Sequence, residues 1–273
     1  MAEKSYKLLV ADIDGTLLNK HGVISDEDTR ALARVGELGI PVSLSTGRVV
    51  QSSLRLLDSL SLDGYHIFFD GALVYNPKTK QEIYASQIKK ELLGQIVDFT
   101  HGLGLDIDLY SIADYFVARE TWVTDIRRDF YDLHPVIVEL EKILLEEKII
   151  KGAIVVSSSE EKAKAEEIRR QFADRLNFSW TGTPAYPDMD FINIIASGVS
   201  KGKALEALAS FLEIPLAEVM AIGDGANDIS LLSTAGLAIA VGNASDDLKA
   251  VADYVTLDVD HNGVAAAINR FLL

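Results

Sequence analysis

Both ends of this chain alternate short apolar strands with amphipathic helices, and this alternation limits the possible folds more than any other feature. Near the start, strand patterns at residues 8–11, 40–45 and 65–69 are separated by helix patterns at about 26–38 and 49–60. Strands connected through helices pair in parallel, and right-handed crossovers place the helices on both faces of one sheet. The pattern therefore predicts an α/β fold with a Rossmann-like, doubly wound parallel sheet.

The middle of the chain has a different rhythm. After a hairpin pattern around Asn76 and Pro77, two long helix patterns accompany strands such as "KGAIVVS" and "NFSWT". Regular alternation resumes with "FINIIAS", which we expect to be a strand of the core, and continues to a closing helix "NGVAAAINRFLL". We therefore expect residues 1–82 as the first part of the core, 83–189 as an inserted α+β cap domain, and 190–273 as the second part of the core.

The composition excludes several kinds of partner and site. With 48% hydrophobic and 25% charged residues, the chain of 273 residues can bury a core. Its net charge of −15 argues against nucleic acid and against an anionic membrane surface, because both attract clustered Lys and Arg. The absence of cysteine excludes a disulfide framework, a thiolate zinc site and a cysteine nucleophile. Without a signal-peptide core or an apolar run near the ~20 residues of a spanning helix, the sequence predicts a cytoplasmic protein.

The first strand ends in a group of polar residues. The apolar residues 8–11 lead directly into Asp12 and Asp14, followed by Gly15 and Thr16. Ligands of open parallel sheets bind where strands end, and Gly15 allows backbone amides to turn toward a ligand. The other Asp-x-Asp pairs, which begin at positions 106, 188 and 258, lack this setting and are interpreted as ordinary strand or turn residues. The first pair is therefore the candidate for chemistry.

Three further strand ends carry polar or charged residues. Thr46, Gly47 and Arg48 follow a strand, where a hydroxyl and backbone amides at a helix start can hold a phosphate oxygen. Lys201 stands at a predicted helix start, where the helix dipole disfavours a cation unless an anion is near. The turn after the strand "VMAIG" adds three more polar residues, Asp224, Asn227 and Asp228. Each residue alone has an ordinary structural explanation, but together they indicate a site.

These residue types fit phosphoryl transfer. The negative charge of a phosphate monoester repels an attacking carboxylate, so transfer requires a divalent cation, a lysine and oriented N–H groups. Carboxylate and amide oxygens are the donors that Mg²⁺ prefers. Asp12 could then attack phosphorus and form an aspartyl-phosphate, while Asp14 could protonate the departing alcohol and later deprotonate water.

The segments "DIDGTLL", "STGR", "SGVSKG" and "GDGANDISLL", in this order, resemble the four motifs of the haloacid dehalogenase superfamily, in its Cof-like branch with a C2 cap. The resemblance implies a Mg²⁺-dependent phosphatase of small phosphorylated metabolites, sugar phosphates first among them, with Asp12 as nucleophile and Asp14 as general acid/base. It implies these phosphate-binding residues: Thr46, Gly47 and Lys201. It places two residues near the substrate, Arg48 and Asn227. The implied magnesium shell comprises Asp12, the Asp14 backbone carbonyl, Asp224 and Asp228.

The sequence departs from the family pattern in two places, at Asp70 and at the "IIAS" run that replaces a Pro often found before "GVSKG". Several alternatives stay open. Asp70 stands where the branch usually has Asn, which would alter the charge near the leaving group. A phosphomutase or phosphotransferase would share the aspartyl-phosphate. A signalling receiver would hold the phosphoryl group without turnover, although it would need neither Asp14 nor the insertion. A noncatalytic relative is the third alternative, and substrate and oligomeric state are left open.

Overall fold

The computed structural model describes residues 6–183 and 186–273. The chain divides into two compact units. Unit 1 holds the chain up to Arg48, Ser53–Ala85 and Ser200–Leu273, and unit 2 holds Val49–Ser52 and Ser86–Val199. No helix among the described residues is long and apolar enough to cross a membrane.

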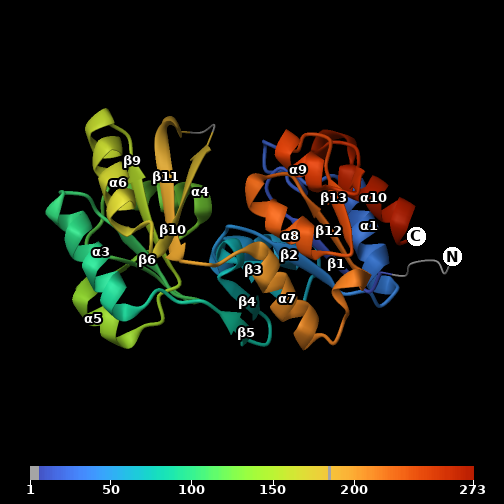
Figure 1. Ribbon diagram of the computed structural model, residues 1–273, viewed down its shortest axis with the longest axis horizontal. Helices are drawn as coiled ribbons and strands as arrows, with labels where there is room; N and C mark the ends of the chain where they lie inside the picture. Colours follow the sequence, from blue (N-terminus) through green and yellow to red (C-terminus); the bar gives the residue numbers. More distant parts are fainter. Residues whose placement is uncertain (1–5, 184–185) are drawn as a thin grey trace. The chain divides into compact units, whose positions relative to one another are not determined.

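Unit 1 is built on a sheet whose described strands follow the order β14-β13-β12-β1-β2-β3-β4-β5 (Figure 1). These strands are β1 (Leu8–Asp12), β2 (Val42–Ser45), β3 (His66–Phe68), β4 (Leu73–Asn76), β5 (Gln81–Ala85), β12 (Val219–Gly223), β13 (Leu237–Ala240) and β14 (Tyr254–Val255). The pairs from β14 to β3 are parallel, and β3, β4 and β5 form an antiparallel meander. The predicted α/β fold and the hairpin around Asn76 are therefore confirmed.

The position of β1 creates the place for a site. In the sheet β1 lies between β12 and β2, and all five of its residues are buried. The chain runs from β1 to β2 on one side and arrives at β12 on the other, so the strand order reverses at β1. In open α/β sheets, the crevice at the carboxyl ends of strands at such a switch point is where ligands bind. Asp12 is the carboxyl-terminal residue of β1 and pairs with Ser45 of β2.

The helices of unit 1 cover the sheet as the amphipathic patterns predict. They are α1 (Asp26–Glu37), α2 (Val50–Ser59), α7 (Lys201–Phe211), α8 (Ile229–Thr234), α9 (Asp246–Val251) and α10 (Gly263–Phe271), with short 3₁₀ turns η1 (Phe69–Gly71), η2 (Leu216–Glu218), η3 (Ala226–Asp228) and η4 (Val259–His261). Figure 1 shows α1 and α10 on the opposite side of β1 and β12 from α7 and α8. Ser25 caps α1 by accepting the Asp28 N–H at 3.0 Å. The first residues of α2 belong to unit 2 by their contacts.

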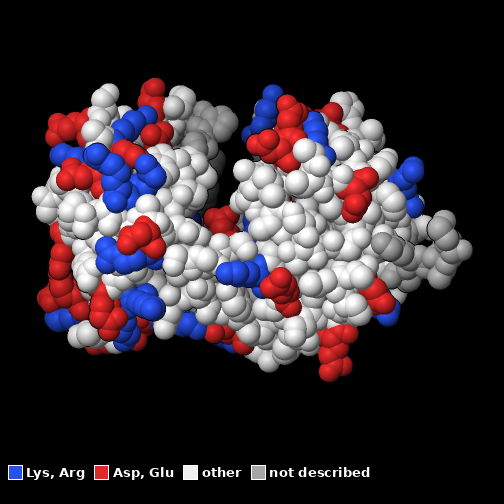
Figure 2. Space-filling model, viewed as in Figure 1, with Lys and Arg blue, Asp and Glu red and all other residues white. Residues whose placement is uncertain are grey.

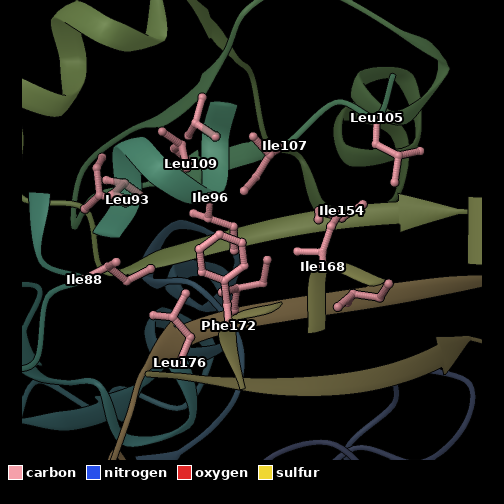
Figure 3. Close-up of a cluster of buried hydrophobic side chains, with 14 of the residues drawn as sticks. Ile88, Leu93, Ile96, Leu105, Ile107, Leu109, Ile154, Ile168, Phe172 and Leu176 are labelled. Carbon is pink, nitrogen blue, oxygen red and sulfur yellow. The ribbon is translucent and has the colours of Figure 1, made fainter. Parts of the chain in front are cut away.

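Unit 2 is an α+β structure with a second sheet in the order β10-β11-β9-β6-β7-β8. Its strands are β6 (Asp108–Tyr110), β7 (Tyr115–Val117), β8 (Val136–Ile137), β9 (Lys151–Val156), β10 (Leu176–Thr183) and β11 (Tyr186–Ala196), and its helices are α3 (Lys90–Gly102), α4 (Trp122–Tyr131), α5 (Leu140–Glu146) and α6 (Ser159–Phe172). Figure 3 shows residues of α3 and α6, such as Ile96 and Phe172, packed with Ile107 and Ile154 in a buried apolar cluster. Burial of this cluster stabilises unit 2 by roughly 25 cal/mol per Å² of apolar surface.

One strand prediction is wrong. The segment Phe191–Ala196, expected to be a strand of the core, pairs antiparallel with β10 and β9 in unit 2. The predicted boundary between residues 189 and 190 lies inside β11, and the contacts place this boundary at Val199 and Ser200 instead. The cause is that both faces of β11 are covered. Ile192 packs into the buried apolar cluster of Figure 3, and Phe191 packs into a smaller cluster with Val155. A strand buried on both faces has the same apolar run as a strand of a parallel core.

Candidate active site

Lys201 and Asp12 form the centre of the candidate site. The Lys201 side chain is fully buried, and Asp12 is only 5% exposed. Lys201 Nζ donates to Asp12 Oδ1 at 2.5 Å, to Asp228 Oδ1 at 2.6 Å and to the Ser45 carbonyl at 3.2 Å. These contacts use the three N–H groups of the ammonium, as a buried charge requires. Ser200 begins α7 by accepting the Lys203 N–H, which places Lys201 at the first position of the helix.

The turn after β12 is shaped by Asp228. Its Oδ2 accepts the backbone N–H groups of Asp224 at 3.1 Å and Gly225 at 3.0 Å, while its Oδ1 faces Lys201. Both oxygens of this fully buried carboxylate therefore have partners inside unit 1. Asp228 thus fixes the conformation of the turn, which determines the position of Asp224.

Asp224 meets the loop that follows β1. Thr16 Oγ1 donates to Asp224 Oδ1 at 3.1 Å, across 208 residues of sequence. Gly15 has a φ of +87°, and a Cβ on this residue would lie 2.2 Å from Asp224 Oδ2, so glycine is required by both backbone conformation and space. Asn243, which is 228 residues away in the sequence, donates from Nδ2 to the Gly15 carbonyl at 2.8 Å and so stabilises the loop.

The acids Asp12, Asp224 and Asp228 fit a hard divalent cation. Each offers a carboxylate oxygen, and these oxygens lie within 4.8 Å of one another. Burial raises the pKa of Asp12 well above its ordinary value, and Asp228 raises it further, against the opposing effect of Lys201. Burial and Asp228 likewise raise the pKa of Asp224 to about 6. Three carboxylates facing one buried ammonium leave excess negative charge, which a cation held by oxygen ligands would offset.

Asp14 lies outside this acidic cluster. Arg48 Nε donates to Asp14 Oδ2 at 2.8 Å and Arg48 Nη2 donates to Asp14 Oδ1 at 2.5 Å, a bidentate ion pair. The Asp14 side chain is 57% exposed and the Arg48 side chain 26% exposed. The structure therefore directs the Asp14 carboxylate toward Arg48.

The segment after β2 forms the remaining edge of the site. Thr46 is buried, and its Oγ1 accepts the Arg48 N–H at 3.0 Å. Backbone bonds tie this segment to η1, because Asp70 N donates to the Thr46 carbonyl at 3.0 Å and Phe69 N to the Arg48 carbonyl at 3.1 Å. A Cβ on Gly47 would lie 2.8 Å from Asp70 Oδ1, so the Asp70 carboxylate sits directly against the Gly47 backbone.

Of the residues predicted from the sequence, the structure brings together Asp12, Lys201, Asp224 and Asp228 through direct contacts or the shared cluster. Asn227 joins them indirectly, since its Nδ2 donates to Asp70 Oδ1 at 2.9 Å. Sequence reasoning missed the pairing of Asp14 with Arg48, the Asn227 contact with Asp70, and the support of Gly15 by Asn243. The one available signal was the departure at position 70, which marked this residue without indicating its partner.

Comparison with known proteins identifies the family of this chain. The sequence model of the family described as haloacid dehalogenase-like hydrolase matches residues 9–268, and the chain belongs to this family. The match includes most of unit 1 and the whole of unit 2. The resemblance drawn from the four motifs is therefore confirmed.

Individual relatives align with nearly the whole of this chain. The chain is 29% identical to phosphatase YwpJ of Bacillus subtilis over 97% of this chain and 100% of that protein. It is also 29% identical to the 5-amino-6-(5-phospho-D-ribitylamino)uracil phosphatase YcsE of Bacillus subtilis, over 98% of this chain and 96% of that protein. Among solved structures, a haloacid dehalogenase-like hydrolase from Bacteroides thetaiotaomicron matches with a TM-score of 0.84 and 27% identity, covering 97% of this chain and 99% of that one. The subclass IIB sugar phosphatase BT4131 matches with a TM-score of 0.76 and 26% identity, covering 97% and 98% of the two chains.

Proposed function

We propose that this haloacid dehalogenase-like hydrolase is a Mg²⁺-dependent phosphatase that hydrolyses small phosphorylated metabolites, sugar phosphates first among them. The observation that carries the proposal is the buried Lys201 ammonium bound to Asp12 and Asp228, with Asp224 in the same cluster of carboxylates. Phosphatase names among relatives that span the full chain support it, and a sugar phosphatase among the structural neighbours supports the substrate class.

Asp12 is the proposed nucleophile. Lys201 holds Asp12 Oδ1, while Asp12 Oδ2 accepts no hydrogen bond from the described residues and is available to attack phosphorus. The Oδ2–phosphorus bond would form as the bond from phosphorus to the ester oxygen breaks, giving an aspartyl-phosphate and an alcohol. In a second step, the oxygen of water would bond to phosphorus and the Asp12 carboxylate would leave, which releases inorganic phosphate.

Asp14 is the proposed proton carrier. It would protonate the departing alkoxide in the first step and accept a proton from the attacking water in the second. The observed ion pair with Arg48 engages both Asp14 oxygens, so this pair has to open before Asp14 can act. Thr46, Gly47 and Lys201 are the proposed phosphate-binding residues, since a hydroxyl, a glycine backbone and a cation lie at one edge of the sheet.

The residues that would hold Mg²⁺ are Asp12 and Asp224, with the Asp14 backbone carbonyl and Asp228 beside them. The bound ion would supply positive charge that offsets the repulsion between the nucleophile and the phosphate dianion. The donor set consists of oxygen atoms, which suits this cation.

The test is phosphate release from a panel of sugar phosphates, other phosphorylated metabolites and a generic aryl phosphate, with Mg²⁺ and with a chelator. Asp12→Asn should abolish release with the fold intact, while Asp58→Asn, a change at an exposed residue of α2, should leave release unchanged. Substantial turnover by Asp12→Asn would remove Asp12 from its role, and indifference to chelation would contradict the metal. A stable phosphoryl-protein without release would favour a phosphotransferase or a signalling module.

A further inference from the structure

We propose that Asp70 selects phosphate esters whose leaving group carries a hydrogen-bond donor close to the ester oxygen, and disfavours leaving groups that carry a carboxylate. This inference rests on the proposed function and assigns a specificity-determining role within the same site. It is carried by the position of the Asp70 carboxylate, by its incomplete set of partners, and by the chemistry of a phosphate monoester.

The backbone places the Asp70 carboxylate at the edge of the site. Asp70 has a φ of +55° and a ψ of 30°, a left-handed conformation that Asp adopts more readily than most residues. Its N–H donates to the Thr46 carbonyl, which anchors the turn to the proposed phosphate-binding segment. The side chain then lies against Gly47, with both of its oxygens within 2.9 Å of where a Gly47 Cβ would be.

The charge of Asp70 is incompletely matched within unit 1. Asp70 Oδ1 accepts the Asn227 amide at 2.9 Å, whereas Oδ2 accepts no hydrogen bond from any residue that the structure describes. The Asp70 carboxylate interacts electrostatically with Lys201, since Asp70 is among the charges that raise the Lys201 pKa. Yet the three N–H groups of Lys201 already bind Asp12, Asp228 and the Ser45 carbonyl. The half-buried Asp70 therefore has an acceptor oxygen that no described residue binds and that is available to a ligand.

The phosphate itself cannot satisfy this oxygen. A phosphate dianion offers acceptor oxygens only, and its charge repels a neighbouring carboxylate. A donor for Asp70 Oδ2 must therefore come from the other half of the ester, as a hydroxyl or an ammonium on the leaving group. A carboxylate on the leaving group would add a second repulsion at the same place, as expected for a site that discriminates by unpaired charge.

The experiment compares four esters of nearly equal size: ethyl, 2-hydroxyethyl, 2-aminoethyl and carboxymethyl phosphate. For the wild type, kcat/KM should be higher for the hydroxyethyl and aminoethyl esters than for the ethyl ester. It should be about tenfold lower for the carboxymethyl ester than for the ethyl ester, the size expected for two charges a few ångströms apart in a partly hydrated site. Asp70→Asn keeps the shape, the tolerance of a left-handed backbone and an acceptor for Asn227, so it removes mainly the charge.

In Asp70→Asn the ratio of carboxymethyl to ethyl phosphate should rise about tenfold, and the advantage of the aminoethyl ester should be lost. The matched control Asp58→Asn should keep the wild-type ratios. If Asp70→Asn changes all four esters by one common factor, Asp70 acts only on the phosphoryl group or the fold, and the inference is overturned. Equal rates for the four esters in the wild type would also overturn it. If the wild type hydrolyses neither these esters nor an aryl phosphate, the proposed function itself fails and the inference falls with it.

Discussion

His66, in strand β3, should make the stability of unit 1 depend on pH. The ring is fully buried, its Nδ1 accepts the Leu44 N–H at 3.0 Å, and its Nε2 lies 3.2 Å from the Leu62 carbonyl. Because a backbone N–H faces Nδ1, the proton of the neutral ring is on Nε2, and both ring nitrogens are satisfied. A second proton on Nδ1 would remove the bond to Leu44 and bury a charge. Burial accordingly lowers the His66 pKa to about 4.

The size and sign of the effect follow from proton linkage. The pKa of His66 is lower in the folded chain than the ordinary value of 6.5, so the unfolded chain binds more protons between these two values. The stability is fully present above pH 6.5 and is lost as pH falls toward 4. The free energy of unfolding should decrease by about 1.4 kcal/mol between pH 8 and pH 5.5, and by about 3 kcal/mol once pH is below 4.

Urea unfolding of the wild type and of His66→Gln between pH 4 and pH 8 measures this effect. Glutamine can accept and donate at a similar reach but does not titrate in this range, so the carboxylates common to both proteins cancel in the difference. The difference in unfolding free energy should shrink as pH falls. A constant difference across this range would refute the assigned protonation state, whatever its size.

Three further predictions concern buried charge and the loop after β1. Lys201→Met should lower the free energy of unfolding at pH 7 by about 3 to 5 kcal/mol, because it leaves Asp12 and Asp228 buried without their cation. Urea unfolding with and without Mg²⁺ should show that the ion restores part of this loss. A variant as stable as the wild type would contradict the pairing. In unit 2, Arg127→Met should lower the free energy of unfolding by about 3 kcal/mol, because Asp108 is 6% exposed and pairs with Arg127 at 3.4 Å. A loss below about 1 kcal/mol in thermal or urea unfolding would show that the pair contributes little. Gly15→Ala should reduce phosphate release at least tenfold while unfolding shifts by only about 1 to 2 kcal/mol, and unchanged release would mean that the loop tolerates a Cβ beside Asp224.

Figure 2 gives a view of how charge is distributed on the surface, where Lys and Arg are interspersed with Asp and Glu on the face shown. Over the whole sequence, Asp and Glu outnumber Lys and Arg, which gives the net charge of −15. The ion pair of Lys201 with Asp12 is different from these surface charges, because both side chains are buried.

The core and the centre of the site could be predicted because their signals are local. Asp12, Lys201 and Asp224 each follow a recognisable strand or begin a helix, and parallel pairing alone brings such positions to one edge. The direction of a long side chain is not a local property. Arg48 could reach a ligand, a carboxylate or solvent from the same backbone, and only the finished loop places it on Asp14. The apolar run of β11 likewise did not indicate which sheet the strand joins, because a strand covered on both faces has the same pattern in unit 1 and in unit 2.

The position of β1 in unit 1 has a consequence for the order in which the protein can fold during synthesis. This strand ends at Asp12, whereas one of its two neighbours, β12, begins only at Val219, and the Thr16 contact with Asp224 spans 208 residues. Until the ribosome has passed Gly223, β1 lacks that neighbour and one row of its backbone groups is unpaired, a condition that favours association with other chains. All the contacts within unit 2 join residues that are complete before Ser200 is added. The candidate site is therefore assembled late, around a strand that is translated long before its neighbour β12.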